Sequence, residues 1–493
     1  MRVSLGAFGS SARAALEALA RALGPAREAW VVGGAMRDAL DGRTARDLDI
    51  AVPAGAIALA REVADRLGAA FYVLDEARGA ARIGGGSGYA WQGPQVDFAD
   101  FRAPDLAGDL RGRDFTVNAL AAAVPPLVTA GEADVEDPTD GFADLHARRV
   151  RLCAPRSLDD DPVRVLRAAG FGAQPAWELD AGVEGAALRA APGLRGASAE
   201  RIRDEILGML AGPASAAGLR LLDRWGALAV LLPESHAMKA TAQSEPHRFD
   251  VWEHSLRAVE GADLLASRAG ELEPWGEAFA AHLGEPLGDG ATRREALKLA
   301  ALLHDVAKPE TRSVENGRTR FLGHDTLGAQ RVRAIAERLR LSGRLTAVLE
   351  RLVRHHLRPM HLAQSGGATR RARFRFFRDL GDDARDLLLL ALADTAALRG
   401  GPPLAVWDGP DGRIVRELMA GHAEEAAALS APPLLDGRDA MDALGLQPGP
   451  ELGRLLRLLR EAQAVGAVTT REGALTYIRE MRDQPLDTSE PAP

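Results

Sequence analysis

Two aspartates near the N-terminus have the spacing of a metal site. Asp47 and Asp49 lie in the segment DLDI, and residues i and i+2 of a strand point to the same face of a sheet. Carboxylates placed together can bind Mg²⁺ while leaving room for phosphate oxygens. Gly33 and Gly34 precede them in VVGGAMRD, where glycines let backbone amides approach a phosphate at the start of a helix. Glycines followed by an Asp-x-Asp pair are the parts that nucleotidyl transfer requires.

Each of these signals also has a plainer interpretation. A Gly-Gly pair is more often a turn, and an Asp-x-Asp is more often a solvated strand end or loop. Their order, about thirteen residues apart, favours the chemical interpretation. Asp97, in the later segment QVDFADF, is a candidate third carboxylate, and an ordinary strand residue is the alternative.

A second polar group follows in DLRGRDFTVNALA, residues 109–121. Its polar members crowd the start of a predicted helix and are Arg111, Arg113, Asp114 and Asn118. The buried side of that helix is expected to consist of Phe115, Val117 and Leu120. The guanidinium fork matches phosphate oxygens, so the arginines suit a triphosphate, and the asparagine suits a ribose hydroxyl. Taken alone, the same residues also fit a helix start with salt bridges.

The second half of the chain carries a separate group of histidines and aspartates. An adjacent His-Asp pair with a distant His and a distant Asp supplies mixed nitrogen and oxygen ligands, which suit a transition metal or Mg²⁺. The segments, in or beside predicted helices, are WEHSL with His254, LALLHDVAKPET with His304 and Asp305, FLGHDTLGAQ with His324, LVRHHLRP with His355 and His356, and LALADTAAL with Asp394. A lone histidine on a helix is usually a core or surface residue, so it is the grouping that favours a metal site.

Length and composition indicate the class of protein that carries these sites. At 493 residues the chain is expected to form three or four domains, and 46% hydrophobic with 26% charged residues is typical of soluble globular proteins. One cysteine excludes an internal disulfide framework. With neither a secretory signal nor a membrane-length apolar run in the sequence, a cytoplasmic protein is the simplest expectation. A net charge of −8 argues against coating nucleic acid over the whole surface, yet allows a local basic track.

Strands and helices that would position the first site alternate up to about residue 134. Apolar spacing predicts helices over 12–23 and 55–67, and AWVVGG, FYVLD, AARIGG and QVDFADF are predicted strands. We interpret GGGSG, residues 84–88, as a hairpin turn, because the lysine and helix of a phosphate loop do not follow it. Helical periodicity then dominates, with Ser198 as the expected N-cap of a helix that pairs Arg201 with Glu205.

Four blocks stand in a fixed order in the first half: GGAMRD…RDLDIAV, GRDFTVNALA, DPTDGFADL, and DDDPVRVLRA followed by AERIRDEI. Over residues 28–210 they closely resemble the bacterial class II tRNA nucleotidyltransferase and poly(A) polymerase family. The resemblance implies tRNA, CTP and ATP as partners. It also implies that Asp47 and Asp49 bind two Mg²⁺ ions, one activating the RNA 3′ hydroxyl and the other stabilising the leaving pyrophosphate.

Nucleotide binding is assigned by the same resemblance. The implied residues are Gly33, Gly34, Arg37, Arg113, Asp114, Asn118, Asp161, Arg164 and Arg167. Asp161 and Arg164 match the neck pair that selects the incoming base along its pairing edge, where a carboxylate and a guanidinium suit C or A and mismatch G and U.

The second group resembles the HD phosphohydrolase superfamily. The metal ligands that this implies are His254, His304, Asp305 and Asp394, holding a divalent transition metal or Mg²⁺. Lys308 is expected near phosphate, and His324 and His356 match additional histidines for a second metal or a phosphate. Some tRNA nucleotidyltransferases use such a domain as a phosphatase or cyclic phosphodiesterase on RNA ends. The intact ligand set predicts an active site, and a relic is the alternative.

Two departures bear on specificity. Gly112 stands where the family usually has a second arginine. CCA-adding members usually carry an insertion of a dozen or more residues after the strand ending in FR, linked to the switch from C to A. Here Arg102 is followed only by APDLAG before Asp109. A CC-adding or otherwise partial specificity is therefore expected beside full CCA addition.

We therefore predict a multidomain chain: an α+β nucleotidyltransferase head, a small mixed sheet plus helices, followed by an all-α neck, HD body and tail. The expected domains are a head at 1–150, a helical neck or RNA-binding region at 151–228, an HD domain at 229–410 with a surface insertion near 261–291, a tail at 411–482 and a disordered end at 483–493. The segment TRRARFRFFR, residues 369–378, is a candidate RNA-binding element, and an amphipathic helix with Phe inside and Arg outside is the plainer interpretation. Both hold if the Arg face meets tRNA phosphates.

The leading hypothesis is a tRNA nucleotidyltransferase that adds C, as CC or within full CCA, with a second phosphohydrolase site. A poly(A) polymerase is the first alternative, although such members typically lack an HD domain and carry a basic tail, whereas this chain has the HD residues and an acidic end. An HD phosphohydrolase with a degenerate transferase head is the second, and the intact Asp47–Asp49 pair argues against it.

Overall fold

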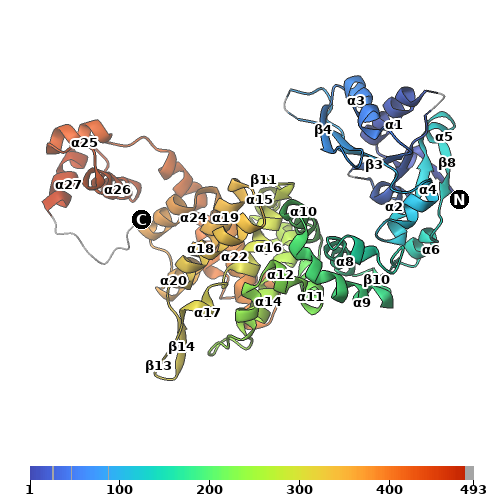
Figure 1. Cartoon of the computed structure of the whole chain (residues 1–493). Coiled ribbons are helices and arrows are strands. Elements are labelled where there is room, and N and C mark those ends of the chain that lie inside the picture. Colours follow the sequence, from blue (N-terminus) through green and yellow to red (C-terminus); the bar gives the residue numbers. More distant parts are fainter. Residues whose placement is uncertain (25–26, 46, 87, 484–493) are drawn as a thin grey trace. The chain divides into compact units, whose positions relative to one another are not determined.

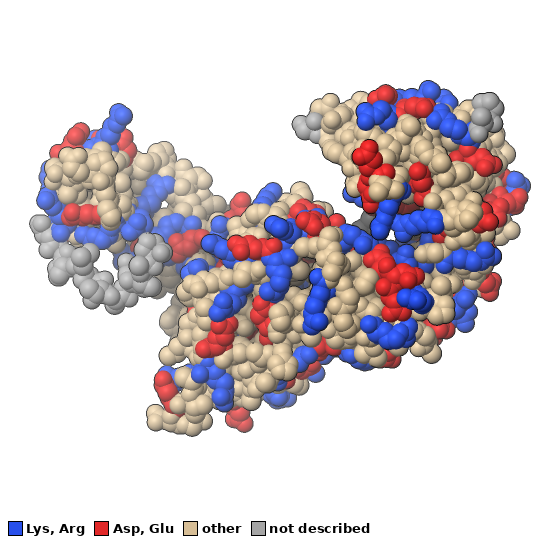
Figure 2. Space-filling view, viewed as in Figure 1, with Lys and Arg blue, Asp and Glu red and all other residues tan. Residues whose placement is uncertain are grey.

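The computed structural model describes residues 1–24, 27–45, 47–86 and 88–483. It forms two compact units, Met1–Pro233 and Glu234–Pro493 (Figure 1). Within the described ranges, no helix has the length and apolar character needed to cross a membrane. Basic and acidic side chains are interspersed over the face shown in Figure 2. The predicted disordered end at 483–493 lies, apart from its first residue, outside the described residues.

A mixed eight-stranded sheet forms the centre of the first unit, with the order β1-β8-β7-β2-β3-β6-β5-β4. The strands are β1 Arg2–Ser4, β2 Trp30–Val32, β3 Leu48–Val52, β4 Ala70–Asp75, β5 Ala80–Gly84, β6 Val96–Asp100, β7 Ala121–Ala123 and β8 Glu132–Glu136. The four predicted strands are confirmed as β2, β4, β5 and β6. Neighbours are antiparallel except β3 and β6, whose parallel register sets Asp49 opposite Asp97.

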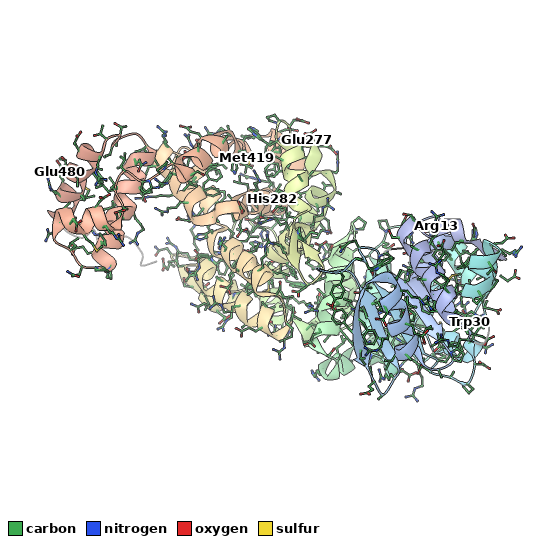
Figure 3. All side chains as sticks on the ribbon, turned by 90° about the horizontal axis from the view of Figure 1, so that it is seen from above. Arg13, Trp30, Glu277, His282, Met419 and Glu480 are labelled. Atoms are coloured by element: carbon green, nitrogen blue, oxygen red, sulfur yellow. The ribbon has the colours of Figure 1, made fainter. Side chains whose placement is uncertain are left out.

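Two predicted amphipathic helices are confirmed as α1 (Ser10–Leu23) and α3 (Ala56–Leu67). They lie side by side, and α3 packs on β4, β5 and β6 (Figure 1). Arg13 points outward from α1 in Figure 3, as the helical spacing requires. The Asp100 carboxylate accepts a hydrogen bond from the backbone N of Ala56 at 2.8 Å and so fixes the start of α3. One sheet face is thereby apolar and covered, and the other is left for polar residues.

The helix expected over 109–121 is wrong in its extent. Helix α4 (Leu106–Arg111) covers only the first three residues of that range, a 3₁₀ turn covers Thr116–Asn118, and β7 follows. Asp114 Oδ1 accepts hydrogen bonds from the backbone N of Phe115 and from the side chain of Asn118. Such local side-chain bonds compete with helical ones and favour a turn. The expected inward residues Phe115, Val117 and Leu120 are nevertheless fully buried.

Short segments separate the remaining helices of the first unit. They are α2 Gly33–Leu40, α5 Val124–Thr129, α6 Gly141–His146, α7 Ser157–Asp160, α8 Arg164–Gly172, α9 Ala181–Ala190, α10 Ala199–Leu210, α11 Ser215–Arg224 and α12 Ala227–Leu231, with two short strands β9 Arg149–Val150 and β10 Glu178–Leu179. Ser198 caps α10 as predicted, accepting from the backbone N of Arg201 at 3.3 Å. The expected Arg201–Glu205 pair is wrong, because Arg201 donates to Asp161 and Glu205 accepts from Arg167.

The second unit is mainly helical. Its helices are α13 Glu234–Lys239, α14 Val251–Arg268, α15 Gly276–Leu283, α16 Arg293–Leu303, α17 Lys308–Thr311, α18 His324–Arg338, α19 Gly343–His355, α20 Arg358–Gln364, α21 Arg370–Leu380, α22 Ala384–Arg399, α23 Pro403–Asp408, α24 Arg413–Ser430, α25 Gly437–Leu444, α26 Pro450–Ala464 and α27 Arg471–Asp483. Two hairpins interrupt them: β11 (Pro286–Gly288) with β12 (Ala291–Thr292), and β13 (Arg312–Glu315) with β14 (Arg318–Phe321). Helices α14, α16 and α22 pack on one another.

The segment 261–291 is not the surface excursion that its composition suggested. It completes α14 and forms α15, whose Phe279, His282 and Leu283 are buried. Figure 3 shows His282 among the helices of the second unit. The His282 ring contacts the Asp386 carboxylate at 2.8 Å, and that carboxylate also pairs with the buried Arg293. Polar residues in this segment are therefore used inside the unit.

Helix α21 confirms the amphipathic interpretation of TRRARFRFFR, and RNA binding by its arginines stays a prediction. Its buried residues include Phe374, Phe376 and Phe377. Arg375 and Arg378 both pair with Glu461 of α26, at 2.8 and 2.6 Å. The Arg-rich face thus joins the helices of the C-terminal half of this unit.

Asp144 provides a pH-dependent test of the first unit. Burial alone would raise the pKa of Asp144, but hydrogen bonds from Thr116, Arg149 and Arg151 lower it below the ordinary carboxyl value. A lowered pKa contributes stability that is complete above the ordinary range near 4 and lost as pH falls through the folded value. We expect Asp144→Asn to weaken protection of β7 and β9 amides at pH 7 by about 2 kcal/mol. Hydrogen exchange should show the difference from wild type shrinking toward acid pH, and a constant difference would contradict this account.

Candidate active sites

The first site lies where β3 and β6 run parallel. A cavity of about 450 Å³ opens on this face and is lined by Asp49, Asp97 and Arg113 among others. Asp47 lies exposed in the bend just before β3. The predicted carboxylate pair and the candidate third carboxylate are therefore brought to one end of one parallel strand pair, an arrangement that suits a divalent cation with open positions for phosphate oxygens.

Gly33 is required by the close approach of Asp49. Its φ is 71°, and a Cβ atom at this position would lie 2.7 Å from Asp49 Oδ2 and 3.2 Å from an Nη of Arg113. A larger residue would both strain the backbone and displace the carboxylate. Gly34 has no comparable restriction, because its Cβ would meet its nearest neighbour, Arg37, at 3.6 Å. Of the two glycines, Gly33 is therefore the one that the geometry of the site requires.

The electrostatics of the cavity favour a cation. Burial raises the pKa of Asp49 above its ordinary value; the positive charge of Arg113 opposes this shift, and the negative charges of Asp97 and Asp47 add to it. Asp97 is neutralised by Arg82 of β5, whose Nε and Nη2 donate to its two oxygens at 2.7 and 2.8 Å. Clustered carboxylates form the donor set that hard divalent cations take.

The predicted nucleotide-binding residues form a chain of polar contacts on the far side of the cavity. Arg37 donates to the Asn118 oxygen at 2.8 Å, and the Asn118 amide donates to Asp114 at 3.1 Å. Asp114 in turn accepts from Arg167 at 2.6 Å. Burial would raise the pKa of Asp114, but the charge and hydrogen bond of Arg167 lower it. Because Asp114 is buried and satisfied by these contacts, it fixes Asn118 and Arg167 in place.

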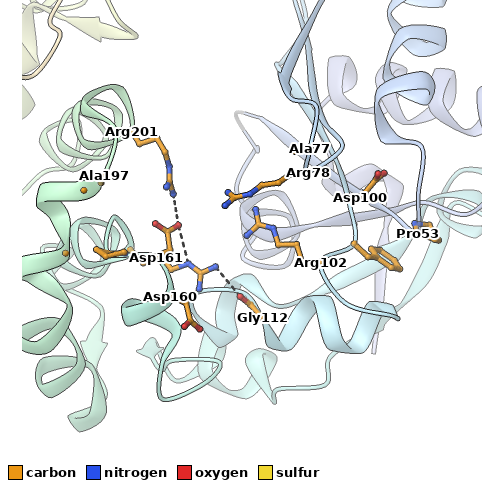
Figure 4. Close-up of a pocket in the computed structure, with 15 residues that line it drawn as sticks. Pro53, Ala77, Arg78, Asp100, Arg102, Gly112, Asp160, Asp161, Ala197 and Arg201 are labelled. Carbon is orange, nitrogen blue, oxygen red and sulfur yellow. Dashed lines mark hydrogen bonds and ion pairs between the residues drawn. The ribbon is translucent and has the colours of Figure 1, made fainter.

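A second cavity of about 810 Å³ adjoins the first and is lined from both the sheet and the helices after it. In Figure 4, Arg78 and Arg102 extend toward it from the sheet side, opposite Asp161 and Arg201. Asp161 accepts a hydrogen bond from Arg201 at 2.6 Å and lies 3.8 Å from the Nε of Arg164. The predicted base-selecting pair is therefore brought together at this cavity, with a third member.

Arg164 is held by the backbone. Its guanidinium donates to the carbonyl oxygens of Ser157 at 3.0 Å and Gly112 at 3.1 Å, the second of which is drawn in Figure 4. Burial lowers the pKa of Arg164 relative to a free guanidinium. Gly112, the departure noted in the sequence, thus contributes its carbonyl to the cavity wall.

Sequence reasoning missed two residues of this region. Arg201 was assigned to a pair with Glu205, although its block AERIRDEI belongs to the resemblance and marks it for attention. Arg82 carried no signal, because its bidentate contact with Asp97 depends on the pairing of β5 with β6.

The link after Arg102 is short and fixed. Helix α4 begins at Leu106, and Asp105 caps it by accepting from the backbone N of Gly108 at 2.7 Å. The backbone N of Arg102 donates to the Asp109 carboxylate at 3.0 Å. Both ends of this segment are therefore tied to the same helix.

The second site gathers six side chains from five helices or their ends. Two groups of three have ligand atoms within 4.8 Å of one another: His254, His304 and Asp305, and then Asp305, His324 and His356. Asp305 belongs to both, so its two oxygens face two nitrogen pairs. His254 Nε2 also contacts Asp394 Oδ1 at 2.8 Å, which joins the fourth predicted ligand to the first group.

The donor set fits a metal centre. The imidazole Nδ1 atoms of His304, His324 and His356 lie 2.9, 2.6 and 2.7 Å from backbone carbonyls, so their Nε2 atoms face inward. Among the described residues, His304 Nε2 and both Asp305 oxygens lack a hydrogen-bond partner of normal geometry although they are buried. Unsatisfied buried polar atoms aimed at one point are what a cation would satisfy.

Charge within this cluster is strongly coupled. Burial would lower the pKa of His304, but the Asp305 and Asp394 carboxylates raise it to about 10. Burial lowers the pKa of His356 to about 4. Lys308 is buried, and its Nζ lies 2.6 Å from Asp305 and donates to the Gln243 oxygen at 2.8 Å, which adds a positive charge beside the cluster. The negative charges of Asp305 and Asp394 exceed the one positive charge of Lys308, so the centre favours a bound cation.

Three family models match the chain. A Poly A polymerase head domain matches residues 29–151, a probable RNA and SrmB-binding site of polymerase A matches 178–239, and an HD domain matches 251–397. The first covers the carboxylate site, and the third covers the His-Asp cluster.

Two curated relatives match nearly end to end. The A-adding tRNA nucleotidyltransferase of Deinococcus radiodurans is 35% identical over 92% of this chain and 96% of its own length. The CC-adding tRNA nucleotidyltransferase of Thermus thermophilus is 36% identical over 92% and 93%. The crystal structure of Bacillus stearothermophilus CCA-adding enzyme in complex with CTP superposes with a TM-score of 0.60 at 20% identity, covering 96% of this chain and 98% of that one, which shows a shared fold.

The two histidine groups give a prediction on metal binding. Titration with Co²⁺ should produce visible absorption from nitrogen ligation, a signal that the all-carboxylate first site would not give. We expect Asp305→Ala to abolish most of this signal, because Asp305 is shared by both groups. His324→Ala should remove about half of it, because His324 belongs to only one group. His355→Ala, one residue from the cluster and outside both groups, is the matched control. Equal signals from Asp305→Ala and wild type would contradict a metal centre here.

Proposed function

The chain belongs to the class II tRNA nucleotidyltransferase family of CCA-, CC- and A-adding enzymes and carries an HD domain, and from this premise we propose that it adds two C residues to tRNA 3′ ends from CTP. The observation that carries the proposal is the carboxylate group of Asp49, Asp97 and Asp47 behind Gly33, beside arginines suited to a triphosphate. The printed names of the relatives support tRNA as the acceptor.

In this proposal each residue of the head has one role. Asp47 and Asp49 hold Mg²⁺, with Asp97 as a third carboxylate. The bound ions would supply activation of the 3′ hydroxyl and stabilisation of the leaving pyrophosphate. Arg113 and Arg37 bind triphosphate oxygens near Gly33 and Gly34. Asn118, oriented by Asp114, binds the sugar, and Arg167 closes this polar chain against Glu205.

Base choice is assigned to the cavity shown in Figure 4. A carboxylate accepts and a guanidinium donates, so Asp161 and Arg164 together match the pairing edge of cytosine. Arg201 holds Asp161 at 2.6 Å, and the Ser157 and Gly112 carbonyls hold Arg164. Because both members are fixed before the nucleotide arrives, protein can serve in place of a template.

Stopping at CC is supported by the link after Arg102. Three residues connect Arg102 to α4, and hydrogen bonds tie both ends to that helix. A segment held in this way has no slack for the rearrangement that would convert a C pocket to an A pocket. The CC-adding names of the relatives from Thermus thermophilus and Geobacter sulfurreducens, 36% and 32% identical, agree with this proposal.

A-addition is the second candidate. The Deinococcus radiodurans relative, named A-adding, is as similar to this chain as the CC-adding ones, at 35% identity. In that case ATP would be the donor, and the acceptor would be a tRNA already ending in CC.

For the HD site we propose metal-dependent hydrolysis of phosphate esters on RNA ends. His254, His304, Asp305 and Asp394 would hold one divalent cation, and His324 and His356 would share Asp305 around a second. Such ions would polarise a phosphoryl oxygen and supply a bound water as nucleophile. Lys308, held between Asp305 and Gln243, would contact a phosphate bound at these ions.

Sequencing of product ends tests the transfer proposal. A tRNA transcript lacking CCA is incubated with CTP, with ATP and with both, and a transcript ending in CC is treated in parallel. We expect CTP alone to extend the first transcript by two C residues, and the mixture to give the same product, because the fixed link forbids the switch. Addition of A to the CC-ended transcript would instead establish A-addition, and long A tracts would contradict tRNA-end synthesis.

The HD site is tested by separating the two activities. Asp305→Asn should reduce release of phosphate from RNA ends carrying 2′,3′-cyclic or terminal phosphates by at least about 100-fold, since it removes a ligand common to both metal groups. The same variant should retain CTP incorporation, because Asp305 belongs to the other compact unit. Hydrolysis unchanged in Asp305→Asn would mean that this cluster is not the hydrolytic site.

A further inference from the structure

One row of side chains crosses the sheet from its edge to the carboxylate site. Tyr72 of β4 is the register partner of Arg82 on β5, Arg82 is the partner of Asp97 on β6, and Asp97 is the partner of Asp49 on β3. Residues directly opposite one another on neighbouring strands point to the same face. Tyr72 therefore stands on the same face as the carboxylates, at the open end of their row.

Helix α3 covers the opposite face beside Phe71, which supports this orientation. Phe71 points toward α3, where the guanidinium of Arg61 lies 4.3 Å from the centre of its ring. Ala81 and Phe98, neighbours of the row in sequence, are buried on that side. Because side chains alternate along a strand, Tyr72 points away from α3.

Three large apolar side chains of this strand are exposed, Tyr72, Val73 and Leu74. Tyr72 is 54% exposed and Leu74 is 50% exposed, and Leu74 lines the same cavity as Asp49. β4 is the last strand in the sheet order, so this strip ends at solvent. Exposed aromatic surface that leads into a charged cavity is suited to stacking on a planar ligand.

Charge along the row also suits a nucleic acid. Arg82 binds both oxygens of Asp97 and stands between that carboxylate and Tyr72, with its side chain 37% exposed. Its guanidinium neutralises the acidic residue of the row that lies nearest to Tyr72, so a phosphodiester that follows the row from Tyr72 meets Arg82 before Asp97. Asp49, at the far end of the row, is where a cation is expected.

We propose that Tyr72 is a stacking platform for the 3′ end of the RNA acceptor. This rests on the proposed function, because the reacting 3′ hydroxyl must then lie at Asp49. Three strand spacings, roughly 14 Å, separate Tyr72 from Asp49. At that distance the ring cannot stack on the terminal base, because the terminal nucleotide carries the 3′ hydroxyl that reacts at Asp49. The Tyr72 ring therefore stacks on a base upstream of the terminal nucleotide, and Arg82 faces the intervening phosphate.

Steady-state kinetics of Tyr72→Ala, Tyr72→Phe and Val73→Ala test this assignment. Val73 is the matched control, since it is 47% exposed on the same strand and its side chain points to the opposite face. We expect Tyr72→Ala to raise KM for tRNA by about tenfold or more while KM for CTP stays within twofold, because stacking on a base is lost. Tyr72→Phe keeps the ring and should match wild type, as should Val73→Ala.

The opposing outcomes are separable. Unchanged KM for tRNA in Tyr72→Ala, or an equal rise in Val73→Ala, would overturn the stacking assignment while the transferase remained active. A rise in KM for CTP alone would assign the strip to the incoming nucleotide and would likewise overturn it. A wild-type protein that incorporates neither CTP nor ATP would instead refute the proposed function itself.

Discussion

The parallel pairing of β3 and β6 is the constraint on which the first unit depends. It sets Asp49 beside Asp97 in a sheet that is otherwise antiparallel, and so concentrates negative charge at one point. Gly33 is needed because Asp49 reaches into the space of a Cβ atom. Arg82 offsets Asp97, and Arg113 opposes the rise in the pKa of Asp49. These contacts offset the repulsion between the neighbouring carboxylates. A bound cation would replace part of this charge compensation.

Both candidate sites use one aspartate at the meeting point of several elements. Asp49 is bordered by β2, β3 and β6, and Asp305 is bordered by residues of α14, α18 and α19. The compensating groups differ in kind. Arginines surround the first site, which suits a polyphosphate, whereas imidazoles and one lysine surround the second, which suits a tighter metal centre and a single phosphate. The two compact units thus carry two different ligand sets.

Local sequence patterns predicted much of this arrangement. Strand alternation located β4, β5 and β6, and the DLDI and His-Asp motifs located both carboxylate centres. Long-range pairing was not visible: nothing near Arg82 or Arg201 in the chain indicates Asp97 or Asp161. The helix assigned to 109–121 failed because the Asp114 side chain forms hydrogen bonds that helical periodicity ignores. Apolar residues within 261–291 were outweighed by its Pro, Gly and acidic residues, although Phe279 is fully buried.

The most direct test of this account is the rate at which Asp49→Asn transfers labelled CMP to a tRNA lacking CCA. Asn keeps the shape of the side chain and removes the charge that would hold Mg²⁺. Asp134→Asn, a change at an aspartate of β8 whose side chain is 82% exposed, is the control. With tRNA binding retained, the account predicts a fall of about 10³-fold or more for Asp49→Asn and none for Asp134→Asn. A rate for Asp49→Asn within tenfold of wild type would contradict it.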